Sequence, residues 1–382
     1  MVQVPKFMST TRLKLVPPLP LRKPISLALQ GGGAWGAYTW GVLDALLASR
    51  RIAIDQISGT SAGALNGAVL ASAFASAANA GRRAQAHEQA REALESFWRS
   101  ISGPGGSAAA LLLWQPITDA LRSSVGQWLW ASGLHSPYSS NPLGINPLRE
   151  SIAKHVDIDA IRSELAPALY VTVTNVRTGL PRIIANAEMS IDALAASACL
   201  PQVFQAVELD GEPYWDGGFS GNPTLWPLIR HGSNGGAGDV VLVQLAPDYC
   251  AETPKDAAAI KRRVGDIMFN SSLVAEMQAI AAIREAAQGS RRQQAVSPFA
   301  AVRMHRIGPP PAALQEQGNA AERSWTWLTQ LRDEGRAAAR TFLKRHAADL
   351  GRRETLDIAK IFQSQQKPRI RARGAAKAVA AR

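Results

Sequence analysis

The feature that most constrains the fold is a serine between two glycines, Gly59-Thr60-Ser61-Ala62-Gly63, which separates an apolar segment from a stretch of small residues. This G-x-S-x-G pattern is typical of a sharp turn from a strand into a helix, because side chains at the glycines would collide there. Residues 52–57 are the expected strand and residues 62–78 the expected helix. Such a turn presents the Ser61 hydroxyl above the sheet and directs the helix N-terminus, with the Ala62 N–H, at the same place.

The segments before and after this turn predict an α/β fold. Residues 24–30 form an apolar run that ends in glycines, and residues 37–48 have helical apolar spacing, so strand, helix, strand and helix alternate. Further strands are expected at 168–175, 181–185, 203–209, 239–245 and 300–307, and further helices at 191–199, 254–288 and 321–349. We expect a three-layer sandwich with a mostly parallel central sheet, a nucleophile-elbow serine and a helical insert.

Composition shifts divide the chain into four segments. Residues 1–23 are a basic, proline-containing N-terminal extension, residues 24–250 the catalytic domain, residues 251–350 a helical part packed on it, and residues 364–382 a basic, disordered tail. The insert at about 81–142 contains two apolar runs, Leu111-Leu112-Leu113-Trp114 and Trp128-Leu129-Trp130. These runs favour either a lid that contacts a bilayer or ordinary helix cores packed on the sheet.

The net charge of +12 is concentrated at the two ends, since residues 1–23 carry five Lys or Arg, residues 364–382 carry six, and neither has an acid. Basic ends are attracted to anionic membranes or nucleic acid, and of these we expect peripheral membrane contact; the alternative is a solvated terminus. Two cysteines, no secretory pattern and no apolar run of eighteen residues lead us to expect a cytoplasmic protein. The oligomeric state is left open.

A glycine cluster follows the first expected strand: Gly31-Gly32-Gly33-Ala34-Trp35-Gly36. One interpretation is a dinucleotide fingerprint with Asp55 as its acid, about twenty residues on. The other is an oxyanion hole made by the N–H groups of Gly31, Gly32, Gly33 and Ala62. We favour the oxyanion hole because Asp55 lies within the approach to the serine turn and Trp35 fits poorly against a pyrophosphate.

Asp216-Gly217-Gly218 is the candidate site of the base. A D-G dipeptide alone is a standard hairpin signal. A serine nucleophile nevertheless needs a base within hydrogen-bond reach, and Asp216 is the best-placed acid.

The six histidines allow a conventional triad as an alternative, with His231 or His305 as its third member. Structural roles are the more ordinary explanation for each of them: His87, His135, His155, His231, His305 and His346. No His and Cys residues have metal-ligand spacing, so we expect neither a metal nor another cofactor. Cys199 is expected to be a buried small residue.

Taken together, these motifs resemble the patatin-like phospholipase family. The resemblance rests on the glycine cluster with Gly41-Val42-Leu43, the serine turn, residues 196–204 (ASACLPQVF) and Asp216-Gly217-Gly218, and it covers about residues 25–246. It implies a Ser–Asp dyad without histidine, with Ser61 as nucleophile, Asp216 as base and the Gly31–Gly33 loop as oxyanion hole. Gly36, Gly59, Gly63, Gly217 and Gly218 support the motifs. The family commonly has arginine where Trp35 stands.

The resulting hypothesis is a serine acyl-hydrolase, a carboxylic-ester hydrolase that cleaves fatty-acyl esters of phospholipids or other lipids through an acyl-enzyme. A polyester or thioester hydrolase, or an acyltransferase, could use the same dyad. The alternative of another class is a nucleotide- or lipid-binding module with a structural glycine loop.

Overall fold

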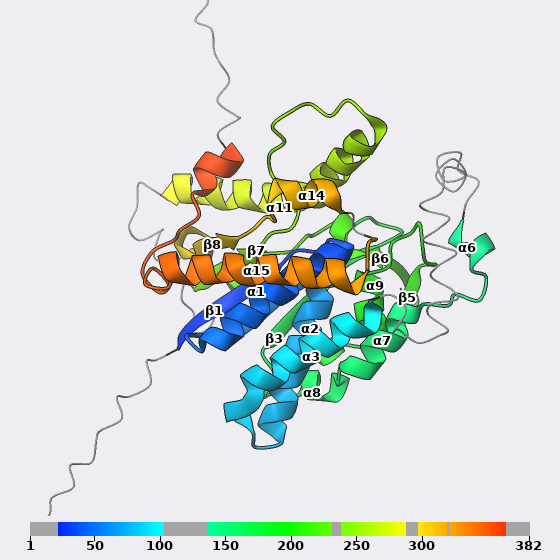
Figure 1. The fold of residues 1–382 in the computed structure, drawn as a ribbon, viewed down its shortest axis with the longest axis horizontal. Coiled ribbons are helices and arrows are strands. Elements are labelled where there is room, and N and C mark those ends of the chain that lie inside the picture. The colour runs from blue at the N-terminus through cyan, green and yellow to red at the C-terminus, as the bar shows by residue number, and fades with distance from the viewer. Residues whose placement is uncertain (1–21, 103–135, 231–237, 288–296, 319–320, 364–382) are drawn as a thin grey trace, which may run out of the picture.

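The computed structural model describes residues 22–102, 136–230, 238–287, 297–318 and 321–363. Its centre is an eight-stranded sheet (Figure 1). Neighbouring strands are parallel along the row β3, β2, β1, β7 and β8. These five strands are β1 (Lys23–Leu29), β2 (Ile52–Thr60), β3 (Ala168–Asn175), β7 (Asp239–Val243) and β8 (Arg303–Ile307).

The other strands are antiparallel and lie at the β3 end of the sheet: β4 (Pro181–Ile184), β5 (Val207–Leu209) and β6 (Glu212–Asp216). Val171 and Thr172 each pair with both β2 and β4, so these two strands flank β3 on opposite sides. Val173 and Thr174 each pair with both β4 and β6, so β6 also lies opposite β4. Strands β2 and β6 therefore follow one another along the same edge of β3.

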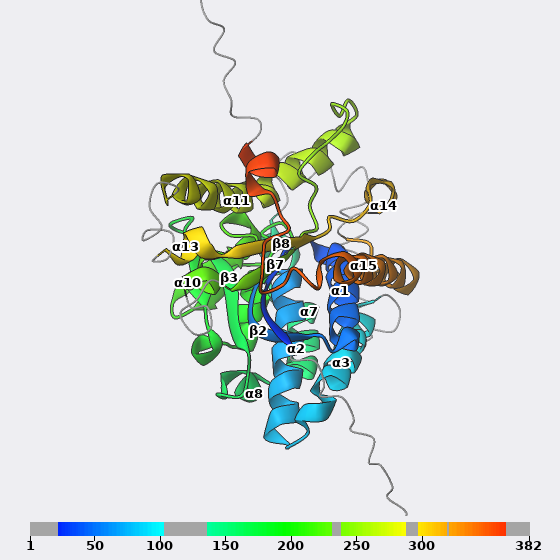
Figure 2. The same cartoon turned by 90° about the vertical axis from the view of Figure 1, so that its left-hand side faces the viewer.

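Helices cover both faces of the sheet (Figures 1 and 2). One face carries α1 (Gly36–Ser49), α2 (Ala62–Asn79), α3 (Ala86–Ile101) and α15 (Trp325–His346). The other carries α10 (Trp226–Arg230), α11 (Ala257–Ala287) and the π-helix η7 (Ala359–Gln363). The predicted three-layer α/β fold with a mostly parallel central sheet is thus confirmed.

Short helices connect these elements. They are η1 (Gly33–Trp35), η2 (Arg83–Gln85), α6 (Pro137–Ser140), α7 (Pro147–His155), α8 (Ile158–Arg162), η4 (Asn186–Glu188), α9 (Ile191–Ser197), η5 (Gly217–Phe219), α13 (Pro298–Ala301) and α14 (Ala312–Gln317).

The core consists of two apolar layers separated by the sheet. Along β1, Leu27 and Leu29 belong to the layer under α1 and α2, whereas Ala28 belongs to the layer under α11. Along β7, Val241 faces the first layer and Leu242 the second. This alternation explains the continuous apolar runs in the sequence, because a parallel strand covered on both faces has no polar side.

Helix α15 packs closely on α1 through glycines of both helices. A Cβ atom at Gly41 would lie 1.9 Å from the carbonyl oxygen of Arg332, and one at Gly335 would lie 2.1 Å from that of Tyr38. Strand β8 also joins the central sheet next to β7. The C-terminal part therefore contributes to both the helical layer and the sheet, while the predicted boundary near residue 250 stays a prediction.

Most of the predicted elements lie where the sequence placed them, and β3 has the predicted bounds. The strand predicted at 203–209 was too long, because residues 201–204 form turns and only Val207–Leu209 pairs. Strand β6 was not predicted. It forms a hairpin with β5 across Asp210 and Gly211, whose φ values of 53° and 79° suit a two-residue hairpin turn.

Several predicted features lie outside the described residues: most of the N-terminal extension, the apolar runs at 111–114 and 128–130, and the tail at 364–382. Of the insert's tryptophans, Trp98 is a buried core residue of α3. None of the helices in the described ranges combines the length and the apolar character needed to cross a bilayer.

Candidate active site

Ser61 lies at the turn between β2 and α2, in a backbone conformation that is rare for a residue with a side chain. Its φ is 53° and its ψ is −125°. The turn is closely packed, since a Cβ atom at Gly63 would lie 2.1 Å from the carbonyl oxygen of Leu29. One at Gly59 would lie 2.7 Å from the carbonyl oxygen of Gly63. The two glycines of the motif are therefore required by contact with backbone atoms.

The Ser61 backbone is also held from the side of β3. Its N–H donates to Ser197 Oγ at 2.9 Å, and the Ser197 hydroxyl donates to the carbonyl oxygen of Thr172 at 2.7 Å. Both side chains are buried, with 8% of Ser61 exposed. Ser197 is the last residue of α9 and belongs to the segment 196–204 that is shared with the patatin-like phospholipases in the sequence comparison above. Through its hydrogen bond with the Ser61 N–H, this segment holds the serine turn in place.

Asp216 meets Ser61 because β2 and β6 follow one another along β3. Thr60, the last residue of β2, pairs with Thr172, and Asp216, the last residue of β6, pairs with the adjacent Val173. The Ser61 hydroxyl lies close enough to the Asp216 carboxyl group to lower its pKa. Two residues 155 positions apart in the chain (216 − 61) are thus brought into contact by sheet register.

The Asp216 carboxylate is only 1% exposed. Burial raises the pKa of Asp216 to about 7, although the Gly218 N–H, which donates to the carboxylate, and the nearby Ser61 hydroxyl lower it. The Gly218 hydrogen bond is 2.7 Å long, and the Asp216 N–H donates to the carbonyl oxygen of Cys199 at 2.8 Å. The result is a fixed carboxyl group that titrates near neutral pH.

The glycine loop approaches Ser61 directly. A Cβ atom at Gly31 would lie 2.7 Å from the Cβ atom of Ser61, so only glycine fits at this position. The Gly31 N–H donates to Asn222 Oδ1 at 2.7 Å, and it is therefore already in use. Within the described residues, the N–H groups of Gly32 and Gly33 have no acceptor. They are the loop's available donors, together with the first N–H groups of α2, which lack helical acceptors.

A buried amide network, formed by Gln30, Asn222 and Asn270, holds the glycine loop. Gln30 Nε2 donates to Asn270 Oδ1 at 2.8 Å, and Gln30 Oε1 accepts from the N–H groups of Leu245 and Ala246. Asn222 Nδ2 donates to the carbonyl oxygen of Phe269 at 3.1 Å. The network ties β1, the segment after Asp216 and helix α11 to one another. Sequence reasoning missed it, and the only signals were polar residues at the end of an apolar strand and before Pro223.

The N-termini of α1 and α2 lie side by side behind the loop. A Cβ atom at Gly36 would lie 2.6 Å from that of Ala62. Asn66 Nδ2 donates to the carbonyl oxygens of both residues, and Trp98 Nε1 donates to Asn66 Oδ1. Two helix N-termini thus concentrate partial positive charge beside Ser61. The Trp35 ring packs edge-on against Trp327 of α15 at 5.6 Å.

The dinucleotide alternative fails on the position of Asp55. This residue lies five positions before Thr60 in β2, which places it about 16 Å along the strand from the serine turn. An acid that binds a ribose must lie beside the glycine loop. Asp55 lies in the middle of the strand and is too far from the glycine loop for this role.

A triad with His305 is also inconsistent with the structure. His305 Nε2 is 2.9 Å from Asp239 Oδ1, and Nδ1 is 2.9 Å from Thr355 Oγ1, so both ring nitrogens have partners. Asp239 begins β7, at the opposite end of the parallel strands from Ser61. The arginine and histidine partners hold the pKa of Asp239 well below its usual range. His231 and His135 lie outside the described residues.

Cys199 is fully buried, as the sequence predicted. Burial, with a smaller contribution from the neighbouring Asp216 charge, raises the pKa of its thiol to about 12. Such a thiol remains protonated at neutral pH and is a poor nucleophile.

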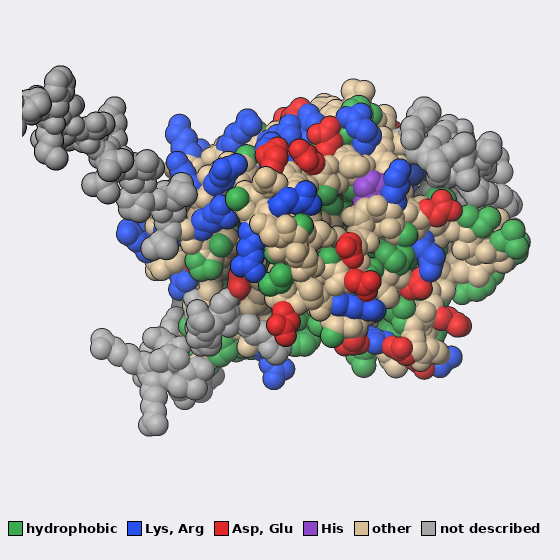
Figure 3. Space-filling view, turned by 90° about the horizontal axis from the view of Figure 1, so that it is seen from below, with side chains coloured by type: hydrophobic (Ala, Val, Ile, Leu, Met, Phe, Trp, Pro, Cys, Tyr) green, Lys and Arg blue, Asp and Glu red, His purple; other side chains and the backbone are tan. Residues whose placement is uncertain are grey.

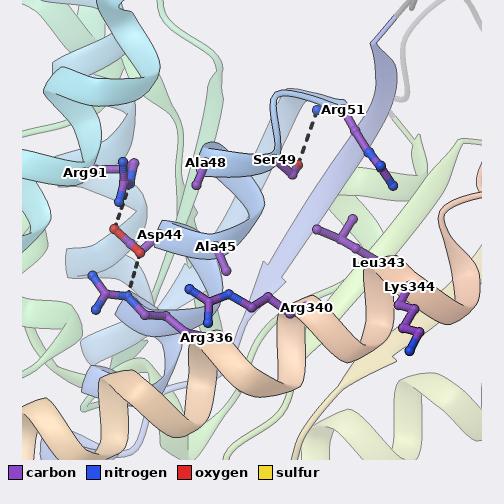
Figure 4. A pocket seen from close by; sticks show the side chains of 10 residues that line it. All are labelled: Asp44, Ala45, Ala48, Ser49, Arg51, Arg91, Arg336, Arg340, Leu343 and Lys344. Atoms are coloured by element: carbon purple, nitrogen blue, oxygen red, sulfur yellow. Dashed lines mark hydrogen bonds and ion pairs between the residues drawn. The ribbon is translucent and has the colours of Figure 1, made fainter.

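A groove of about 630 Å³ opens elsewhere, between α1, α3 and α15 (Figure 4). Asp44 lies at its floor and pairs with Arg91 at 2.9 Å and Arg336 at 2.6 Å. Arg340 and Lys344 extend the basic lining along α15. Basic side chains also gather on the surface at the end of the molecule where α1 and α15 terminate (Figures 1 and 3). The groove contains neither Ser61 nor Asp216.

Comparison with known proteins identifies the family. The sequence profile of the patatin-like phospholipases matches residues 27–229, and the chain belongs to this family, whose members are lipid acyl hydrolases. No curated protein matches the chain. Among solved structures, VipD from Legionella pneumophila is similar at 15% identity and a TM-score of 0.37, over 86% of this chain and 67% of that chain. A similarity of that size carries no functional argument.

Proposed function

We propose that the chain is a serine acyl-hydrolase in which Ser61 is the nucleophile and Asp216 is its base. The observation that carries the proposal is the position of the Ser61 hydroxyl beside a fully buried carboxyl group whose pKa is about 7. A base with this pKa is ionised in part at neutral pH and still has the basicity to accept a proton from serine. An ordinary surface aspartate would be a far weaker base.

The reaction would run in two steps. Asp216 accepts the Ser61 proton while the serine oxygen attacks an ester carbonyl carbon, and the N–H groups of Gly32, Gly33 and Ala62 donate to the oxyanion. Asp216 then returns the proton to the departing alcohol. Water then attacks the acyl carbonyl carbon and gives a proton to Asp216, and Asp216 passes this proton to the Ser61 oxygen as its bond to the acyl group breaks and the fatty acid leaves.

The proposed substrate is a fatty-acyl ester of a phospholipid or another lipid, in keeping with the family. A thioester, a polyester or an acyl acceptor other than water would use the same dyad. Product analysis distinguishes hydrolysis from acyl transfer, because only hydrolysis releases free acid in proportion to the ester consumed.

The test is a hydrolysis assay on phosphatidylcholine vesicles, a triacylglycerol emulsion and a soluble butyrate ester. Ser61→Ala and Asp216→Asn should each reduce turnover by a factor on the order of a thousand, and the double variant should lose little more. The exposed residues Ser96 and Asp159 offer matched controls, Ser96→Ala and Asp159→Asn, which should remain active. Wild-type turnover by Asp216→Asn would refute the dyad.

A further inference from the structure

The first half of α11 carries an apolar stripe that has no packing partner within the described part of the chain. The stripe consists of Ile260, Val264, Ile267 and Met268, and each of these side chains is between 45% and 53% exposed. At 100° per residue, the four positions span an arc of about 100° on the helix surface. The buried side of the helix, represented by Asn270, Leu273 and Met277, lies on the other side.

The stripe is confined to the end of α11 that lies at the candidate active site. Met268 directly precedes Phe269, whose ring stands 2.4 Å from the position of a Cβ atom at Gly218. The Phe269 carbonyl oxygen accepts from Asn222, and Asn270 is itself a member of the amide network that holds the glycine loop. On the same face further along α11, the exposed residues are small, such as Ser271 and Ala275. The helix end that carries the stripe projects from the body (Figures 1 and 2).

Basic residues border the stripe. By the same helical spacing, Lys261 lies at one edge of the apolar arc and Arg263 at the other. The Arg263 guanidinium donates to the carbonyl oxygens of Pro247 and Asp248 and is fixed in that position. An apolar arc between cations is the arrangement by which an amphipathic helix lies in the interface of an anionic membrane.

We propose that this stripe docks the protein on an anionic lipid surface, with α11 lying in the interface and Ser61 beside it. The occupant is an anionic lipid surface for two reasons. The apolar stripe suits the acyl chains and its flanking cations suit the anionic headgroups, and the stripe adjoins the site proposed to bind lipid. This inference rests on the proposed function. The basic groove between α1 and α15 is a separate surface and is not part of this proposal. It begins near Arg51, at the opposite end of β2 from Ser61, about 26 Å away along the strand.

The experiment measures flotation of the full-length chain with vesicles of phosphatidylcholine and phosphatidylserine, in a Ser61→Ala background so that lipid is not consumed. Adding Ile260→Ser and Ile267→Ser should weaken partitioning at least tenfold. The matched control is Ile283→Ser, which removes an exposed isoleucine at the far end of the same helix and should not change partitioning. Ile267→Trp should bind more tightly, since tryptophan favours the interface.

The same substitutions with Ser61 intact separate docking from chemistry. Hydrolysis of a soluble butyrate ester should stay within about twofold of wild type, while hydrolysis of vesicle lipid falls with binding. Undiminished vesicle binding by the Ile260→Ser, Ile267→Ser protein would overturn the proposal. So would a wild-type dimer that this variant converts to a monomer, because a second copy would then cover the stripe. Stripe-dependent binding without any ester hydrolysis would instead refute the proposed function alone.

Discussion

Replacing Asp216 with asparagine should stabilise the protein while it removes activity. The pKa of Asp216 is about 7 in the folded protein, against an ordinary value of 3.8, so the folded state holds this proton more tightly than the unfolded state. Ionisation of the buried carboxyl therefore costs stability as pH rises from about 4 to about 7, and the cost is constant above that range. Three pKa units correspond to about 4 kcal/mol at pH 8, and to about 2 kcal/mol at pH 5.

The measurement is the free energy of unfolding by urea at several pH values between 5 and 8.5. Asp216→Asn should exceed wild type by up to about 4 kcal/mol at pH 8, and the difference should shrink toward pH 5. Glu252→Gln, which neutralises an exposed carboxyl, is the control. The reasoning is refuted if Asp216→Asn and wild type have the same free energy of unfolding across this range.

Three further outcomes are expected. Asn222→Ala should lower kcat by a factor of about 10 to 100 with a smaller change in KM. The reason is that the Gly31 N–H loses its acceptor, so the glycine loop is no longer held in a fixed position. An unchanged kcat would show that Asn222 has no part in the site. His305→Gln should lower the melting temperature but leave kcat within about tenfold, whereas loss of turnover in folded protein would favour a triad. Deletion of residues 364–382 should weaken sedimentation with anionic liposomes at low salt, since each Lys or Arg contributes about 1 kcal/mol near such a surface, and leave soluble-ester hydrolysis unchanged; equal sedimentation would leave the tail as a solvated terminus.

The sequence predicted those parts of the fold in which local pattern and tertiary environment agree. Strand β3 is flanked by turn residues and buried on both faces, so its apolar run has clear ends. Strand β6 contains Pro213 and polar residues and stands between two D-G dipeptides, Asp210-Gly211 and Asp216-Gly217. Both dipeptides are hairpin signals. Asp210-Gly211 forms the hairpin turn, whereas Asp216-Gly217 ends β6 beside Ser61. This difference depends on the pairing of β6 with β3 and β5, which the local sequence does not show.

The candidate site shows the same division. Ser61 and the glycine loop each lie in a single strand–turn–helix unit. Because the close packing within each turn admits only glycine at certain positions, these two parts of the site could be predicted from the sequence. The contact of Ser61 with Asp216 depends on the register of β2 and β6 along β3, which no local pattern encodes. The links from Gln30 to Asn222 and Asn270 span 192 and 240 positions and involve amides that carry no motif.

The most direct test of the dyad is covalent labelling by a fluorophosphonate, followed by peptide mass analysis. An activated serine attacks this probe, whereas an ordinary buried hydroxyl does not. We expect one adduct per chain, on Ser61, no adduct in Ser61→Ala, and labelling at least a hundredfold slower in Asp216→Asn. An unlabelled wild-type protein, an adduct on another residue, or equal labelling rates in wild type and Asp216→Asn would contradict the assignment of Ser61 and Asp216 as nucleophile and base.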